Sequence, residues 1–206
     1  MAVVGRKPNP ERKPELLRAV VAELVRSGLA GVSLRPLAHA LGVSTYTLSY
    51  HFGSKEQLLA EALSYVEAEQ RQLVAAWTAE SGPEPSAARV IERYWTWVSR
   101  PENLAQVRLV FEVITSPQGA ELLPGEHRRQ LMSAWVELIA GELHAQGVPK
   151  RRASVEATIA ASALAGMVLD LLATGDQRRL ATAARALGDR LVVAPNARFD
   201  LEDACE

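Results

Sequence analysis

Hydrophobic residues recur at helical spacing along most of the chain, and no segment alternates polar and apolar residues long enough to form a sheet. Turn residues separate the periodic stretches. We therefore predict an all-α protein. The expected helices cover about residues 14–27, 34–41, 45–52, 54–77, 86–100, 103–115, 126–146, 153–174 and 176–193, with a loop over 117–125.

Helix-capping residues support the first four of these helices. Ser33 and Ser44 stand where N-caps are expected, and Ser54 and Gln57 have the spacing of a capping box. The helix that Ser54 opens is long enough to join two domains. We predict a basic arm and three-helix domain over residues 1–53 and a helical body over residues 54–206.

Composition indicates a cytoplasmic protein without disulfides. The 206 residues are 48% hydrophobic and 5% aromatic, and they contain one cysteine, Cys205. The N-terminus has no apolar stretch of signal-peptide length. The apolar run over 157–173 is too short and too polar for a bilayer span, so we expect a buried helix over these residues and no membrane partner. Residues 1–56 carry eight basic and four acidic side chains, whereas the rest is acidic. A basic end suits a phosphate backbone.

The stretch over residues 33–58 has the pattern of a helix-turn-helix. Two short crossing helices need a small residue at their contact, a turn residue able to take positive φ, and apolar side chains beneath the second helix. Ala38, Gly42, Val43 and Leu48 meet these needs. The second helix then presents hydroxyl, aromatic and imidazole groups that can reach phosphates and base edges. These are Thr45, Tyr46, Thr47, Tyr50 and His51.

This stretch resembles the DNA-binding domain of the Tet repressor (TetR) family. The resemblance covers about 50 residues and is carried by Leu37-Ala38, Gly42-Val43-Ser44, Leu48, His51-Phe52 and Ser54-Lys55-Glu56. The resemblance implies that Lys55 contacts the DNA backbone and that Phe52 holds the recognition helix on the core. We expect Arg35 to contact the DNA backbone as well. Tyr46 replaces a glycine frequent in the family and Ser49 a tyrosine, so we expect Tyr46 to read bases and Tyr50 to brace a phosphate.

The body carries no motif, and the resemblance implies that it binds a small effector and dimerises. We expect an apolar or aromatic ligand against Trp95, Phe111, Met132 and Trp135, within a wider set that includes Trp77 and Trp97; the alternative for each is core packing. Asp170 is either a buried ligand anchor or a paired surface carboxylate.

A homodimer through the last two long helices is expected, with a two-fold axis that matches a palindromic operator. The small-residue face of the first helix and the stripe of the second are its expected contacts. These are Ala157, Ala160, Ala161, Leu164, Val168, Leu171, Leu180, Ala184, Leu187 and Leu191.

These observations favour a sequence-specific DNA-binding regulator, most simply a repressor released by its ligand. A DNA-binding or scaffold protein without a ligand is the alternative. An enzyme is the rival class, but the four histidines lack the i,i+4 pairing of a zinc helix, and no phosphate-binding or nucleophile motif is present. We expect no cofactor, no metal and no catalytic residue. His39 and the basic arm have both a DNA-contacting and a solvated interpretation.

Overall fold

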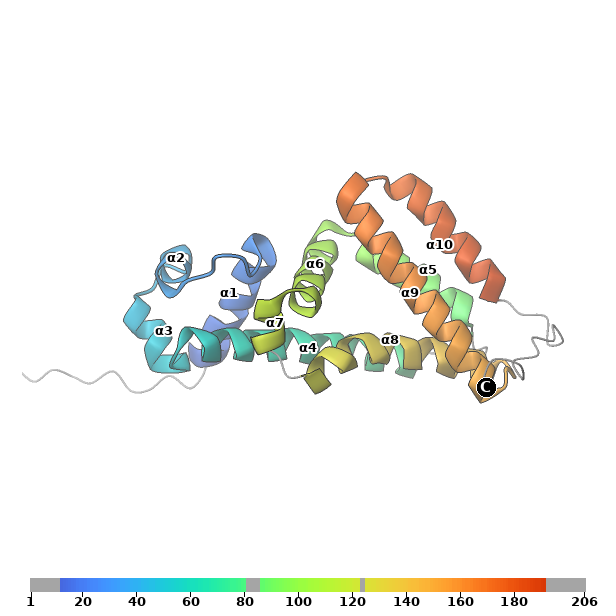
Figure 1. The fold of residues 1–206 in the computed structure, drawn as a ribbon, viewed down its shortest axis with the longest axis horizontal. Coiled ribbons are helices and arrows are strands. Elements are labelled where there is room, and N and C mark those ends of the chain that lie inside the picture. Colours follow the sequence, from blue (N-terminus) through green and yellow to red (C-terminus); the bar gives the residue numbers. More distant parts are fainter. Residues whose placement is uncertain (1–11, 81–85, 123–124, 192–206) are drawn as a thin grey trace, which may run out of the picture. The chain divides into compact units, whose positions relative to one another are not determined.

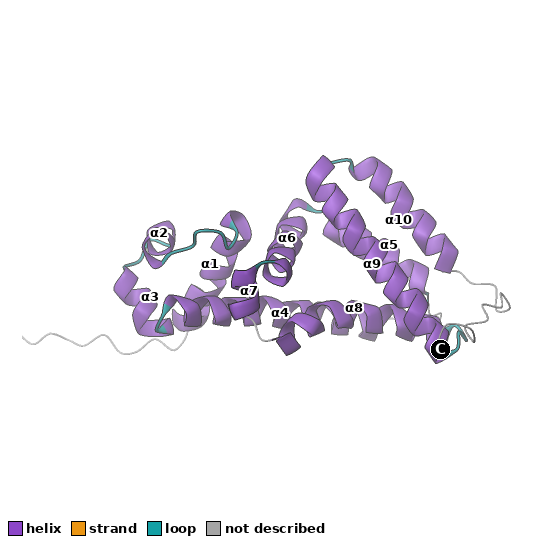
Figure 2. Ribbon diagram, viewed as in Figure 1, coloured by secondary structure: helices purple, strands orange, loops and turns teal. Residues whose placement is uncertain are grey.

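A computed structural model describes residues 12–80, 86–122 and 125–191, and these are helical with short turns between the helices (Figures 1 and 2). No strand occurs in these three ranges, which confirms the all-α prediction. The helices are α1 (Arg12–Ser27), α2 (Leu34–Ala40), α3 (Thr45–Phe52), α4 (Lys55–Ala79), α5 (Ala87–Val98), α6 (Pro101–Thr115), α7 (Pro117–Leu122), α8 (Gly125–Ala145), α9 (Lys150–Thr174) and α10 (Gln177–Leu191).

Two local features differ from the sequence prediction. The expected loop over 117–125 contains the short helix α7, which begins at Pro117, a residue that fits the first turn of a helix. Arg12 and Lys13, expected in a basic arm over residues 1–13, belong to α1. The rest of that arm, residues 1–11, lies outside the described residues.

The described chain divides into two compact units. The first comprises residues up to Gln70 together with Ala105–Leu131, and the second comprises Arg71–Leu104 and the residues from Met132 onward. This division differs from the boundary predicted at residues 53 and 54, because α4 supplies core side chains to the first unit. Helix α6 supplies others, so the helix-turn-helix is closed by helices that lie far away in the sequence.

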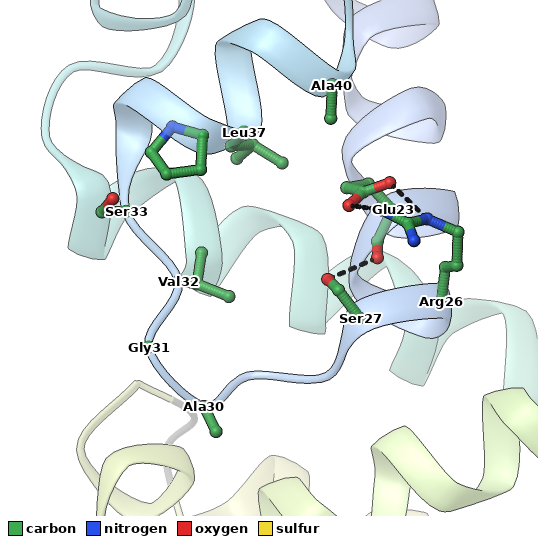
Figure 3. A pocket seen from close by; sticks show the side chains of 10 residues that line it. Glu23, Arg26, Ser27, Ala30, Gly31, Val32, Ser33, Leu37 and Ala40 are labelled. Atoms are coloured by element: carbon green, nitrogen blue, oxygen red, sulfur yellow. Dashed lines mark hydrogen bonds and ion pairs between the residues drawn. The ribbon is translucent and has the colours of Figure 1, made fainter.

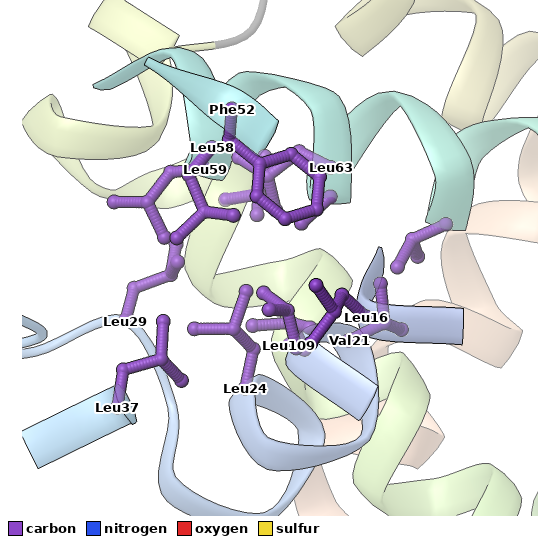
Figure 4. Packing of buried hydrophobic residues seen from close by; sticks show 14 of the residues in the cluster. Leu16, Val21, Leu24, Leu29, Leu37, Phe52, Leu58, Leu59, Leu63 and Leu109 are labelled. Atoms are coloured by element: carbon purple, nitrogen blue, oxygen red, sulfur yellow. The ribbon is translucent and has the colours of Figure 1, made fainter. Parts of the chain in front are cut away.

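The core of the first unit is built from leucines and valines of α1, α2, α3, α4 and α6 around Phe52 (Figure 4). Leu24, Leu48 and Leu59 are fully buried. Leu109 and Val113 of α6 lie in the same cluster. Burying each such side chain contributes about 1.5–3 kcal/mol, so the core holds the recognition helix in one position.

Polar contacts tie α6 to the end of α1. A carboxylate oxygen of Glu112 accepts the backbone N–H groups of Leu29 at 3.0 Å and Ala30 at 3.1 Å. Arg108 donates to the carbonyl oxygens of Val25 at 2.9 Å and Arg26 at 3.3 Å. Carbonyls at a helix C-terminus and N–H groups in a turn lack regular partners, and these two side chains supply them.

In the second unit, α10 packs closely on α5 and also contacts α9 (Figure 1). The two helices lie close at Gly188, where a Cβ would be in van der Waals contact with Ala88 at 3.5 Å. Ile91 and Val98 of α5 are fully buried, as are the inward residues Leu180 and Ala184 of α10.

Helix α9 has two apolar faces, which corrects the predicted dimer face. The residues expected to meet a second chain lie inside the protomer: all are buried except the half-buried Leu187. They are Ala157, Ala160, Ala161, Leu164, Val168, Leu171, Leu180, Ala184, Leu187 and Leu191. The opposite face exposes large apolar side chains, with Ile159 57% and Leu169 53% exposed.

By length and composition alone, α9 could also cross a membrane, and among the described helices it is the only one that could. Core helices of soluble proteins meet the same criterion, so one such helix is weak support for a membrane span.

Candidate nucleic-acid interface

The turn between α2 and α3 is formed by glycine and a serine cap. Gly42 adopts a φ of 63°, which a glycine takes without steric cost. The N–H of Val43 bonds back to the carbonyl of Ala38 at 2.9 Å, and the Ser44 hydroxyl accepts the N–H of Thr47 at 3.1 Å. The start of the recognition helix α3 is thereby held in place. Ser33 also occupies the N-cap position of α2, but its side chain makes no capping bond.

The start of α4 has the predicted capping box. Gln57 accepts the N–H of Ser54 at 2.9 Å, and Ser54 accepts the N–H of Gln57 at 3.2 Å. Bonding to its own backbone N–H, with help from Ser54, lowers the pKa of Glu56. Lys55 is the first residue of this helix and is half-buried. Its charge therefore sits at a helix N-terminus whose N–H groups also attract anions.

Helix α3 presents two tyrosines to solvent. Tyr46 is 76% and Tyr50 70% exposed, and their rings stack with centroids 6.2 Å apart. The His51 ring meets the Tyr50 ring edge-on at 5.1 Å. Two exposed rings one turn apart on an eight-residue helix form an aromatic surface with hydroxyl tips. Such a surface can contact both thymine methyl groups and phosphates.

The remaining predicted DNA contacts are less uniform. Thr45 and Arg35 are exposed, and His39 is exposed on α2. Thr47 is half-buried, and its hydroxyl lies 2.9 Å from that of Ser44, so it takes part in the cap. Its side chain is therefore less available to a ligand than those of Thr45 and Tyr46.

Lys13 has a role that the sequence did not reveal. Its ammonium lies 5.3 Å from the centroid of the Phe52 ring and 2.9 Å from a carboxylate oxygen of Glu61 on α4. The charge of Lys13 thus joins α1 to the end of α3 and to α4. Only the fold brings these three residues together, since 48 positions separate Lys13 from Glu61.

A shallow hollow of about 250 Å³ lies between the end of α1 and α2 (Figure 3). Inside it, Glu23 accepts a bond from Arg26 at 2.9 Å, and this pairing raises the pKa of Arg26. The pair neutralises the charge of the hollow. This hollow therefore offers no net positive charge to an anion.

The four expected effector contacts are divided between the two compact units. Phe111 belongs to the first unit, whereas Trp95, Met132 and Trp135 belong to the second. Trp95 is buried and Met132 exposed. Trp135 lies in an aromatic cluster with Trp77, Tyr94 and Trp97. Of these partners, Tyr94 was not predicted.

Asp170 is a paired surface carboxylate, as one of the two interpretations held. It accepts a bond from Arg179 of α10 at 2.7 Å, and Arg179 lowers the pKa of Asp170. No group of three or more potential metal ligands occurs in the described part of the chain.

The arrangement of α1 to α3 defines a helix-turn-helix DNA-binding protein. The model of the N-terminal domain of the tetR family of bacterial regulatory proteins matches residues 16–62. The HTH-type transcriptional regulator BetI of Stenotrophomonas maltophilia is 29% identical over 77 residues, which span 37% of this chain and 39% of that protein.

Solved structures share the fold over nearly the whole chain. A TetR-family transcriptional regulator from Agrobacterium tumefaciens has a TM-score of 0.66 at 21% identity, covering 88% of this chain and 98% of that one. A regulator from Saccharomonospora viridis, solved in complex with choline, has a TM-score of 0.69 at 19% identity, covering 88% of this chain and 97% of that one. Residues 16–62 thus match the N-terminal domain of the tetR family, and the chain as a whole shares the fold of these solved regulators.

Proposed function

We propose that this protein is a cytoplasmic transcriptional repressor that binds a palindromic operator as a homodimer and releases it on binding a small molecule. The exposed Tyr46–Tyr50 pair carries the proposal. Large aromatic side chains at 76% and 70% exposure are costly to leave in water unless they have a partner, and they lie on the recognition helix.

Major-groove binding by α3 follows from this surface. Tyr46 and Tyr50, with Thr45 and His51, face the bases and the nearest phosphates. Lys55 at the start of α4 and Arg35 in α2 neutralise the backbone. Phosphate contacts set affinity and orientation, whereas base contacts set the sequence preference.

The second copy of the chain covers the exposed face of α9. Val155, Ile159 and Leu169 are exposed apolar residues on this face, and exposed Ser162 and Gly166 lie between them. The positions 155, 159, 162, 166, 169 and 173 follow the alternating spacing of four and three that joins helices in bundles. The small residues in the middle allow two α9 helices to cross closely.

An effector site in the second unit is favoured by the aromatic cluster around Trp135. The choline bound by the Saccharomonospora viridis regulator shows that a protein of this fold can hold a small organic cation. A regulator without a ligand remains the competing function, and it would leave the cluster as packing alone.

Selection of genomic fragments by the purified full chain tests the proposal. We expect enrichment of palindromic sites, and we expect Tyr46→Ala to change the enriched sequence while Thr182→Ala, an exposed change on α10, leaves it unaltered. Binding without sequence preference at physiological salt would contradict the assignment of a specific regulator.

A further inference from the structure

The recognition helix α3 lacks the side chains that make the most selective base contacts. Arginine or lysine pairs with guanine, and asparagine or glutamine pairs with adenine, each through two hydrogen bonds in the major groove. None of these four residue types occurs in the eight residues of α3. Leu48 and Phe52 are buried, and the Thr47 hydroxyl lies against that of Ser44. Base selection by α3 therefore has to use its exposed rings and hydroxyls and the half-buried imidazole of His51.

Tyr46 and Tyr50 form a preorganised pair of rings. They lie one turn apart on α3, with ring planes inclined by 28° and centroids 6.2 Å apart. The His51 ring meets the Tyr50 ring edge-on, at 83° and 5.1 Å. Because successive base pairs are about 3.4 Å apart, the two tyrosine rings extend over about two base-pair steps. Rings already held by their neighbours lose little rotational freedom when they bind DNA.

The thymine methyl group is the base feature that suits such rings. It is the apolar group that base pairs present in the major groove, where the other recognition groups are hydrogen-bond donors and acceptors. A ring that covers a donor or acceptor removes its water without replacing the hydrogen bond, which costs free energy. A ring that covers a methyl group removes apolar surface from water, which is favourable. The two rings therefore favour thymine and disfavour the other bases.

The tyrosine hydroxyls do not alter this preference. A hydroxyl both donates and accepts, so it can bond either kind of group on a base edge and discriminates weakly. It can also bond a phosphate oxygen, which carries no sequence information. Since the hydroxyl lies at the tip of the side chain, a phosphate bond from Tyr50 and a methyl contact by its ring can occur together.

We propose that Tyr46 and Tyr50 select thymine by its methyl group, so that each operator half-site places two thymines within about two base-pair steps of one another. This inference rests on the proposed function, because it names the bases that the DNA-binding surface selects. It makes the two tyrosines the specificity-determining residues of α3.

Uracil substitution tests the proposal, because uracil pairs as thymine does and lacks only the methyl group. The probe is a duplex whose sequence the full chain has enriched from genomic fragments, with one thymine at a time replaced by uracil. Fluorescence anisotropy should show an affinity about fourfold lower at two neighbouring positions of each half-site, the loss that corresponds to one methyl group returned to water. Uracil outside the half-sites is the control and should change nothing. An enriched sequence in which no single uracil weakens binding would overturn the proposal.

Variants of the tyrosines assign the methyl contact to the rings. Tyr46→Phe keeps the ring and should keep the loss at both uracil positions. Tyr46→Ala should abolish the loss at one position and Tyr50→Ala at the other, whereas Ser49→Ala, an exposed change on the same helix, should keep both. Because the two tyrosines are 76% and 70% exposed, these changes leave the core of the first unit intact. If both alanine variants kept both losses, the rings would not be what reads the methyl groups.

Methylated cytosine separates the methyl group from the shape of A·T-rich DNA. Cytosine at either thymine position should bind weakly, and 5-methylcytosine should regain about fourfold in affinity, since it returns a methyl group to the same edge of the base. Equal binding of cytosine and 5-methylcytosine would contradict direct reading of the methyl group and favour recognition of DNA shape.

The selection of fragments separates this inference from the proposed function. A chain that enriches a sequence but responds to no uracil contradicts this inference and leaves the sequence-specific function standing. A chain that enriches no sequence contradicts the proposed function, and this inference with it.

Discussion

Replacing Glu112 by alanine should loosen the junction between α6 and the end of α1. In the native protein one carboxylate oxygen accepts two N–H groups, of Leu29 and Ala30, at 3.0 and 3.1 Å. A bond to a charged group contributes about 1.5–3 kcal/mol, and since Glu112 is half-buried and uses a single oxygen, we take about 2 kcal/mol for the pair. For a chain of this length that loss lowers Tm by about 4–8 °C.

Thermal unfolding followed by circular dichroism measures the effect. Glu112→Gln keeps an acceptor oxygen without the charge, so it should show about half the loss. Glu137→Ala, an exposed change on α8, is the control. Because the junction positions the turn before α2, Glu112→Ala should also weaken operator binding. If Glu112→Ala melted at the same temperature as the control, the junction would contribute nothing and the reasoning would be refuted.

Other changes probe separate parts of the account. Lys55→Ala should weaken binding to all DNA sequences nearly equally and lower the slope of log affinity against log salt concentration by about one. Fluorescence anisotropy measures both quantities. An unchanged slope would show that Lys55 does not contact the DNA backbone. Gly28→Ala should lower the free energy of unfolding by about 1–2 kcal/mol in chemical denaturation, because Gly28 has a φ of 80° and a Cβ would lie 2.9 Å from a Glu112 oxygen. A variant as stable as the native protein would contradict this prediction. Asp170→Asn should be less stable than the native protein at neutral pH, because a carboxyl with a lowered pKa stabilises the fold only while it is ionised. The difference in stability should vanish as acid protonates Asp170 in the native protein. A difference that persists in acid would contradict this prediction. Ile159→Arg should yield monomers by light scattering, whereas the change of exposed Arg185 on α10 to alanine should leave a dimer. A dimeric Ile159→Arg variant would exclude the exposed α9 face as the dimer interface.

Helices α1 to α4 could be predicted from sequence because the signals that start and end them are local. The capping box of Ser54 and Gln57, the serine cap of α3 and the positive φ of Gly42 each depend on residues within a few positions. The contact of Lys13 with Phe52 and Glu61 could not be predicted, since it joins three helices. For the same reason the sequence did not indicate that Glu112 of α6 holds the α1–α2 turn.

The residues predicted for the dimer face are buried in the protomer, and the sequence did not show this for a different physical reason. Helix α9 has apolar residues on two opposite faces, so its periodicity does not say which face meets the same chain and which is free. The alanine-rich face packs inside the protomer, where small residues permit close approach, and the bulkier Val155, Ile159 and Leu169 remain outside. Leu164→Arg would therefore test folding and not assembly, because Leu164 is buried in the protomer.

The aromatic cluster of Trp77, Tyr94, Trp97 and Trp135 could be predicted from sequence only in part. Trp135 and the other tryptophans attracted attention by type, but their meeting with Tyr94 depends on how three helices pack. Trp95, chosen for the same reason as Trp135, is buried elsewhere than in these ring pairs. Residue type pointed to the chemistry, and only the fold selected the members.

A footprint of the full chain on a selected genomic fragment tests the central claim most directly. A dimeric helix-turn-helix repressor should protect two half-sites related by a two-fold axis, with centres one helical turn or a multiple of it apart, and Tyr46→Ala should change protection within both half-sites alike. Protection of a single unsymmetrical stretch, or protection that Tyr46→Ala leaves unchanged, would contradict the account.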